Sequence, residues 1–250
     1  MNEGGLPAHL RFAMSPLVHP HVASWPSQDT PSALAPRTWY AGRTSLDLAQ
    51  GPGWAWIGLR SGDGLNRLHS DLLVALDRLF IELRWAGTRR VALSGSGWMS
   101  GQGRHFSAGA DLHEVGALDP VSAEPFARRG QRVMGHLLWP GWRTLTVISG
   151  VAMGGGCDLA LHGQERWAVD AGPDGRGGLR LAHPAAKHGI LTGFGGTVRL
   201  PELLGAGGAD RLFRHFETWD APVALAAGAV HRRLAPALVR PKVEGWLSGQ

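Results

Sequence analysis

Three consecutive glycines, Gly154 to Gly156, constrain the fold of this chain more than any other feature of its sequence. They follow an apolar run, Thr144 to Ile148, and precede a segment of helical character, Cys157 to Leu161. Glycine permits positive φ and leaves backbone N–H groups unshielded, which suits a sharp strand-to-helix turn. The first N–H groups of a helix lack internal partners and lie at the positive end of its dipole. The junction can therefore hold an anion or a developing negative oxygen, although glycines kept only for close packing would look the same.

Two further stretches of small residues accompany this junction. Gly103 to Glu114 follows a second predicted strand, Arg90 to Ser94, and Gly189 to Pro201 reads G-I-L-T-G-F-G-G-T-V-R-L-P. Together the three stretches resemble the enoyl-CoA hydratase/isomerase (crotonase) superfamily. Its members carry F-[SC]-A-G-x-D-L, G-x-A-x-G-G-G-C-E-L and G-x-x-P-G-x-G-G-T-x-R-L-P in this order. The resemblance covers residues 44 to 232 and implies a spiral of ββα repeats.

The apolar pattern independently indicates an α/β fold. The segments 45–48 and 54–59 predict a hairpin about Gly51 to Gly53, and apolar residues at helical spacing predict a helix from Asn66 to Leu83. Strands and helices alternate along the rest of the chain, which favours an α/β core. The sequence divides into a Pro-rich N-terminal extension over residues 1–43, a crotonase-like core over 44–205 and a short C-terminal helical segment over 206–250.

The C-terminal segment departs from the family pattern. Typical members continue much further beyond the position of Val230, and those helices form trimers and help to close the acyl pocket. Either the N-terminal extension replaces that cover or the pocket is more open. The resemblance implies a homo-oligomer, a trimer or a hexamer.

By resemblance, the backbone N–H groups of Ala110 and Gly155 are expected to bind one thioester oxygen and stabilise an enolate. Asp158 lies three residues beyond Gly155, so a helix would project it from nearly the same face. Hydratases of the family carry a catalytic glutamate there. Aspartate is shorter by one methylene, about 1.5 Å of reach, so it must sit deeper or act through a water. Apolar surroundings would suit it to general acid or base chemistry, and the alternative is a structural bond to nearby backbone.

The second catalytic glutamate of the hydratases falls at Ala185, which cannot transfer a proton. Residues 185–197 contain no carboxylate, which argues against isomerase and dehalogenase chemistry in their usual form. This leaves a one-carboxylate enzyme or a role for His183 or His188, since histidine titrates near neutral pH. A structural role is the alternative for both histidines.

The coenzyme A portion of a substrate is expected along the extended segment of the first motif. Arg104 is a candidate phosphate partner, or an ordinary surface arginine. The residues expected to contact substrate are Arg104, His105, Phe106, Ser107, Ala108, Gly154, Ala185 and His188.

Composition narrows the remaining possibilities. The net charge of +5 comes mostly from arginines that are spread along the 250 residues, so a nucleic-acid partner is not favoured. A single cysteine, Cys157, excludes an internal disulfide and fits a reducing cytoplasm. No apolar run approaches the ~20 residues that span a bilayer. We expect no metal or redox cofactor.

The leading hypothesis is an acyl-CoA-handling lyase that acts on an α,β-unsaturated thioester through an enolate. Two alternatives stay open. One is a CoA-thioester hydrolase or decarboxylase on the same scaffold, for which Ala185 would be no handicap. The other is a non-catalytic acyl-CoA-binding homologue, which could also bind RNA.

Overall fold

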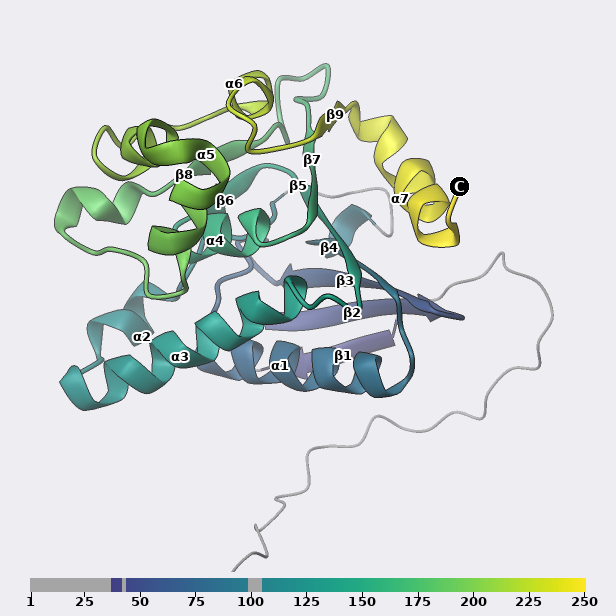
Figure 1. Cartoon of the computed structure of the whole chain (residues 1–250), viewed down its shortest axis with the longest axis horizontal. Helices are drawn as coiled ribbons and strands as arrows, with labels where there is room; N and C mark the ends of the chain where they lie inside the picture. The colour runs from purple at the N-terminus through teal and green to yellow at the C-terminus, as the bar shows by residue number, and fades with distance from the viewer. Residues whose placement is uncertain (1–36, 42–43, 99–104) are drawn as a thin grey trace, which may run out of the picture. The chain divides into compact units, whose positions relative to one another are not determined.

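A single mixed sheet forms the centre of the fold (Figure 1). The computed structural model describes residues 37–41, 44–98 and 105–250. Within them the sheet has the strand order β1-β2-β3-β4-β5-β7-β9. Its strands are β1 (Arg37–Ala41), β2 (Thr44–Gly51), β3 (Trp54–Ser61), β4 (Arg90–Gly95), β5 (Arg143–Ile148), β7 (Glu165–Val169) and β9 (Arg232–Leu234).

The sheet is antiparallel at one end and parallel over the rest. β1, β2 and β3 pair antiparallel, and Gly51 pairs with Trp54 across the turn, which confirms the predicted hairpin. From β3 onward each neighbour is parallel. Strand β1 precedes residue 44, so described structure begins within the expected N-terminal extension.

A second, two-stranded parallel sheet leads into the triple glycine. It pairs β6 (Val151–Met153) with β8 (Arg180–Ala182). Helix α4 (Gly155–Leu161) begins two residues after β6, with Gly154 as its N-cap at φ +52° and ψ −123°. Only glycine adopts such a conformation without strain, so the strand-to-helix turn depends on Gly154.

Helices cover both faces of the main sheet. The remaining helices are α1 (Ser70–Trp85), α2 (Leu112–Gly116), α3 (Pro120–Leu137), α5 (Gly196–Phe213), α6 (Ala221–Ala226) and α7 (Val239–Ser248), with short 3₁₀ turns η2 (Ser96–Trp98), η3 (Pro184–His188) and η4 (Pro236–Leu238). Helices α1 and α3 pack against each other, whereas α7 contacts β3 and β4 (Figure 1). The predicted α/β class with ββα units is confirmed.

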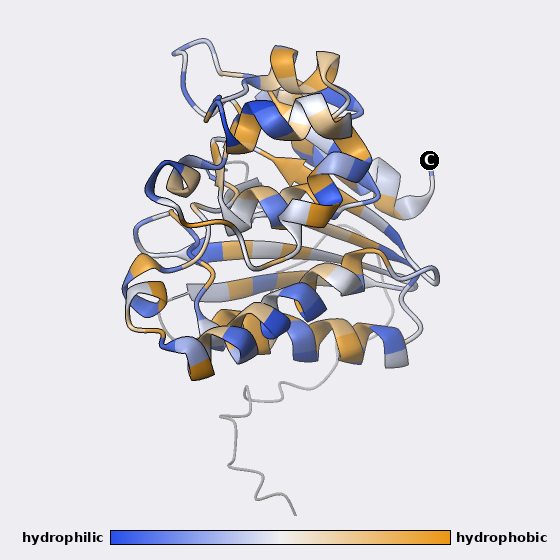
Figure 2. Ribbon diagram, turned by 60° about the vertical axis from the view of Figure 1, so that its left-hand side comes forward, coloured by the Kyte–Doolittle hydropathy of each residue, from blue (hydrophilic) through white to orange (hydrophobic). Residues whose placement is uncertain are grey.

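Alternating residues of β4 explain the two covered faces. Val91 and Leu93 belong to the core cluster that includes the leucines of α1, while Ala92 belongs to a second cluster with Val243 of α7. Strand residues point to opposite faces in turn, so a run that is apolar throughout is buried on both sides. In Figure 2, α1 and α3 carry both hydrophobic and hydrophilic residues, as expected for helices that are buried on one side.

One helix starts later than predicted, and another contains a kink. Helix α1 begins at Ser70, not at Asn66, because Asn66 adopts a left-handed φ of +49°. Helix α5 kinks at Gly205, which has φ +68° and ψ +171°. This kink lies at the expected boundary between the core and the C-terminal segment.

Candidate active site

The first and second motifs meet at two glycines. A Cβ built on Gly109, at φ +95°, would lie 2.3 Å from the Met153 carbonyl oxygen and 3.2 Å from the Gly155 nitrogen. A Cβ on Gly155 would lie 3.5 Å from the Ala110 nitrogen. Cβ and N of one residue are about 2.5 Å apart, so the Ala110 and Gly155 nitrogens lie no more than about 6 Å from each other.

Neighbouring backbone leaves both of these N–H groups free. The Leu68 N–H donates to the Gly109 carbonyl at 2.8 Å, and the Asp111 N–H donates to the Leu68 carbonyl at 3.2 Å. In such a parallel bridge, the N–H of the residue between, Ala110, points away from Leu68. Gly155 is the first residue of α4, so its N–H has no partner in the helix. Within the described residues, neither N–H donates a hydrogen bond.

Asn66 holds the first motif in this position, and sequence reasoning missed it. Its side-chain amide donates to the carbonyls of His105 at 3.0 Å and Phe106 at 3.1 Å. In return, the Ser107 hydroxyl donates to the Asn66 carbonyl at 2.7 Å. The only clue to Asn66 in the sequence was its residue type, because asparagine tolerates the left-handed backbone region better than most residues.

The other expected substrate contacts of the first motif are engaged inside the protein. The N–H groups of Phe106 and Ser107 donate to the Val151 carbonyl, and that of Ala108 donates to the Leu65 carbonyl. The His105 imidazole Nδ1 accepts from the Val151 N–H at 3.1 Å. Arg104 lies outside the described residues. The backbone N–H groups of 106–108 thus anchor the motif to its neighbours.

Asp158 points away from solvent, into a fully buried environment. The Thr192 hydroxyl donates to its Oδ2. Its Oδ1 lies 3.3 Å from the Nε2 of His183. A Cβ on Gly196 would lie 1.9 Å from Oδ1, so the start of α5 accommodates this carboxylate only because residue 196 is glycine. Asp158 is therefore held in place from two sides and is withdrawn from solvent.

The third motif packs on the second through Phe194. Its ring lies so close to Gly155 that a Cβ there would meet it at 2.7 Å, and on the other side it contacts the Cα of Gly130 in α3. The Phe194 N–H donates to the Thr192 hydroxyl at 3.2 Å. One turn thus contacts both the Gly155 backbone and the Asp158 carboxylate. Neither Thr192 nor Phe194 was a predicted site residue.

The remaining predicted residues lie on η3 and at the α4 cap. Ala185 is half-buried and His188 is exposed. The Gly154 N–H donates to the Ala182 carbonyl at 2.9 Å. Ala185 follows two residues after His183 and offers no group that could transfer a proton.

A pocket of about 260 Å³ lies beside Asp111, next to Ala110. Its lining is Thr44, Ser61, Gly62, Asp63, Arg67, His69 and Asp111. Hydrogen bonds from the Leu65 N–H, the Ser61 hydroxyl and Arg67 lower the pKa of Asp63 to about 2. The N–H groups of Glu114 and His113 lower the pKa of Asp111, which caps α2. Both carboxylates are therefore ionised at neutral pH, beside one arginine.

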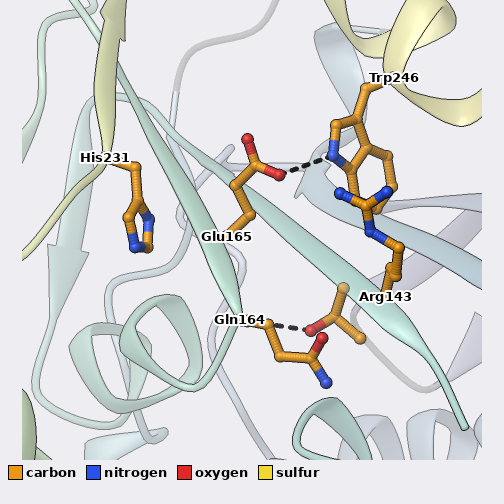
Figure 3. Close-up of a pocket in the computed structure, with 6 residues that line it drawn as sticks. Arg143, Gln164, Glu165, His231 and Trp246 are labelled. Atoms are coloured by element: carbon orange, nitrogen blue, oxygen red, sulfur yellow. Dashed lines mark hydrogen bonds between the residues drawn. The ribbon is translucent and has the colours of Figure 1, made fainter. Parts of the chain in front are cut away.

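A larger pocket of about 330 Å³ lies at the opposite edge of the sheet (Figure 3). Arg143 and Glu165 begin β5 and β7, and His231 precedes β9, so these residues mark the amino ends of parallel strands. The three motifs follow the carboxyl ends. Trp246 of α7 closes this pocket and donates from Nε1 to Glu165 Oε2 at 2.8 Å.

The described residues offer neither a metal-binding cluster nor a membrane-spanning helix. No group of three or more His, Cys, Asp or Glu side chains there could hold a metal ion. No helix among them is long and apolar enough to cross a membrane.

Comparison with known proteins identifies the family of this chain. Residues 95–244 match the family model described as enoyl-CoA hydratase/isomerase. The chain is 31% identical over 173 residues to a short-chain-enoyl-CoA hydratase of Clostridium acetobutylicum, covering 69% of this chain and 62% of that protein. It is 32% identical over 181 residues to a crotonyl-CoA hydratase of Syntrophomonas wolfei, covering 72% and 65%. The alignments thus span a little under two thirds of both relatives.

Solved structures show the same likeness. An enoyl-CoA hydratase from Bacillus anthracis superposes with a TM-score of 0.71 at 26% identity, covering 82% of this chain and 75% of that one. The family-model match over residues 95–244 includes all three motifs.

Proposed function

Because this chain belongs to the enoyl-CoA hydratase/isomerase family, we propose that it is an acyl-CoA lyase that adds water to an α,β-unsaturated thioester. The observation that supports this proposal is that the Ala110 and Gly155 nitrogens lie within about 6 Å of each other, both free of protein acceptors among the described residues. Two such donors suit a thioester oxygen that gains negative charge as an enolate forms. Removing one donor of this kind typically costs about 2.7–4 kcal/mol of transition-state stabilisation.

Asp158 is the proposed acid/base group. It lies one helical turn beyond Gly155, and its carboxylate is withdrawn from solvent. A positioned acid or base contributes about 10²–10⁴-fold to rate, which fits a single carboxylate in a site that lacks a second one at Ala185.

Spectrophotometric hydration of crotonyl-CoA tests the proposal, with Asp158→Asn as the variant. The asparagine keeps the shape and removes the exchangeable charge, so we expect a loss of about 100-fold or more in kcat. Asp77→Asn is the matched control, because Asp77 also pairs with a buried histidine, His136, but away from the three motifs. Equal activity in the wild type and Asp158→Asn would remove Asp158 from the mechanism.

Ala185 favours a second candidate, a CoA-thioester hydrolase or decarboxylase. These reactions use the two N–H donors but need no second carboxylate. Release of free CoA, followed with a thiol reagent, or of carbon dioxide from a substrate panel separates them from hydration.

Assembly into a homo-oligomer and a cytoplasmic location stay predictions, testable by light scattering and by fractionation.

A further inference from the structure

Asp158 Oδ1 and His183 Nε2 face each other inside the protein without any hydrogen-bond partner among the described residues. They lie 3.3 Å apart, and their side chains are 0% and 3% exposed. The distance is that of an ion pair, although the bond angles fall outside those of a hydrogen bond. Two unpaired polar atoms this close, and this deep, require an explanation.

Burial explains why the two groups act together. An ionised carboxylate that is buried alone is costly, and so is an imidazole lone pair that faces it. A single proton between Oδ1 and Nε2 relieves both costs, because it makes one group a donor to the other. The two side chains are therefore best regarded as one unit that holds one proton.

The surroundings orient both side chains of this unit. The Thr192 hydroxyl fixes Oδ2, so the carboxylate cannot rotate freely. Oδ1 abuts Gly196 at the start of α5, where the helix dipole favours a negative charge. The His183 ring packs on Phe213 at a centroid distance of 4.6 Å, which holds Nε2 toward Asp158.

Along the chain, the unit lies close to both positions that the proposed chemistry involves. Asp158 is one helical turn from the Gly155 N–H, and His183 is two residues from Ala185, which has no proton to give. A lone carboxylate would have to take a proton from water and also deliver one to carbon. A partner that shares the proton allows one site to do both.

We propose that His183 is a positioning residue that shares a proton with Asp158, so that the pair carries out the proton transfer at the acyl α-carbon. This rests on the proposed function. When water adds, its oxygen bonds to the β-carbon and its proton passes to Asp158. The electron pair of the C=C bond moves toward the thioester as an enolate, then forms a C–H bond with one proton returned by the pair. The pair ends with the proton count at which it began.

The chain offers a matched control in His136 and Asp77. This pair is also nearly buried, with Nε2 and Oδ1 2.8 Å apart and side chains 7% and 13% exposed. It joins α3 to α1, and neither residue belongs to one of the three motifs. His136→Gln and His183→Gln are thus the same substitution in two buried His–Asp pairs, of which only one lies at the candidate site.

The experiment is exchange of the α-protons of butyryl-CoA with deuterium oxide, followed by NMR with the full chain. A saturated thioester cannot be hydrated, so exchange reports enolate formation and proton return alone. We expect His183→Gln to lose at least 10-fold in kcat for exchange at nearly unchanged KM, and His136→Gln to keep the wild-type rate. Circular dichroism checks that each variant is folded before it is assayed. If His183→Gln does not fold, His183→Asn takes its place.

Wild-type exchange by a folded His183 variant would overturn the proposal, and so would a wild-type protein without exchange. Crotonyl-CoA hydration, measured on the same samples, separates this from the proposed function. If the wild type exchanges α-protons but does not hydrate crotonyl-CoA, the proposed hydratase function is wrong and the Asp158–His183 proposal stands. If His183→Gln hydrates crotonyl-CoA at the wild-type rate, the Asp158–His183 proposal is wrong and the hydratase function stands.

Discussion

Gly155 is a residue whose missing side chain keeps the candidate site open. A methyl group there would lie 2.7 Å from the Phe194 ring and 3.5 Å from the Ala110 nitrogen. We expect Gly155→Ala to lower kcat/KM for crotonyl-CoA by about 100-fold or more, comparable to the loss of one oxyanion donor.

Gly135→Ala is the matched control for that prediction. Gly135 lies inside α3, and nothing lies within 4 Å of a Cβ built there. The change should leave hydration intact and stabilise the protein by up to about 1 kcal/mol, since alanine is the better helix former. Urea unfolding measures the second effect. Full activity in Gly155→Ala would show that the carbonyl does not bind beside this residue.

Cys157 is fully buried next to the candidate acid/base residue, so its thiol should be unreactive in the folded protein. Burial, and then the charge of Asp158, raise the pKa of the Cys157 thiol well above its usual value. Only the thiolate is nucleophilic, so we expect no reaction with a disulfide reagent at pH 8 in the folded protein and full reaction in guanidinium chloride. Rapid labelling of the native state would place Cys157 on an accessible surface.

At the scale of elements, a buried tryptophan in α7 links this helix to the sheet. Trp246 is nearly buried and donates to Glu165 in β7 (Figure 3). Truncating a buried tryptophan to alanine typically costs about 3–5 kcal/mol, so Trp246→Ala should lower the free energy of unfolding by that amount. Because Trp246 lies beside the amino ends of β5 and β7, activity per folded molecule should stay unchanged.

Leu238→Ala is the control at the same end of the chain. Leu238 is 47% exposed in η4, so its loss should change stability by less than about 0.5 kcal/mol. Denaturant unfolding of both variants, with hydration assayed before unfolding, checks the pair of predictions. A large loss of kcat in folded Trp246→Ala would mean that α7 supports the candidate site directly.

For the whole molecule, histidines should set the response to mild acid. Burial is the main cause that lowers the pKa of His136, His162 and His231. Each therefore binds a proton more readily when unfolded, where its pKa is about 6.5. Stability that is present above this value is lost as the pH falls below it, because protonation draws the chain toward the unfolded state.

Urea unfolding at pH 7.5 and pH 5.5 measures this effect. We expect a lower free energy of unfolding at pH 5.5, and a smaller difference in His136→Gln or His162→Gln than in the wild type. The Asp63 carboxylate affects stability only at a lower pH, because its pKa lies at about 2. Equal stability at the two pH values would contradict the prediction.

The sequence by itself determined the family, the α/β class and the backbone positions at the candidate site. These depend on local chemistry: glycine at sharp strand-to-helix turns, and apolar spacing along strands and helices. Gly155 was informative because it permits a close approach that no other residue type allows. Such requirements depend on residues that are close together in the sequence, so they can be predicted without knowledge of the fold.

Only the tertiary structure decided what surrounds Asp158. Its partners Thr192 and His183 come from segments that are 34 and 25 residues away, and Asn66 reaches 39 residues to hold the first motif. Side-chain direction and long-range packing set these contacts, and neither leaves a periodic signal in the sequence. A buried carboxylate obtains its chemistry from its neighbours, and the fold brings those neighbours together.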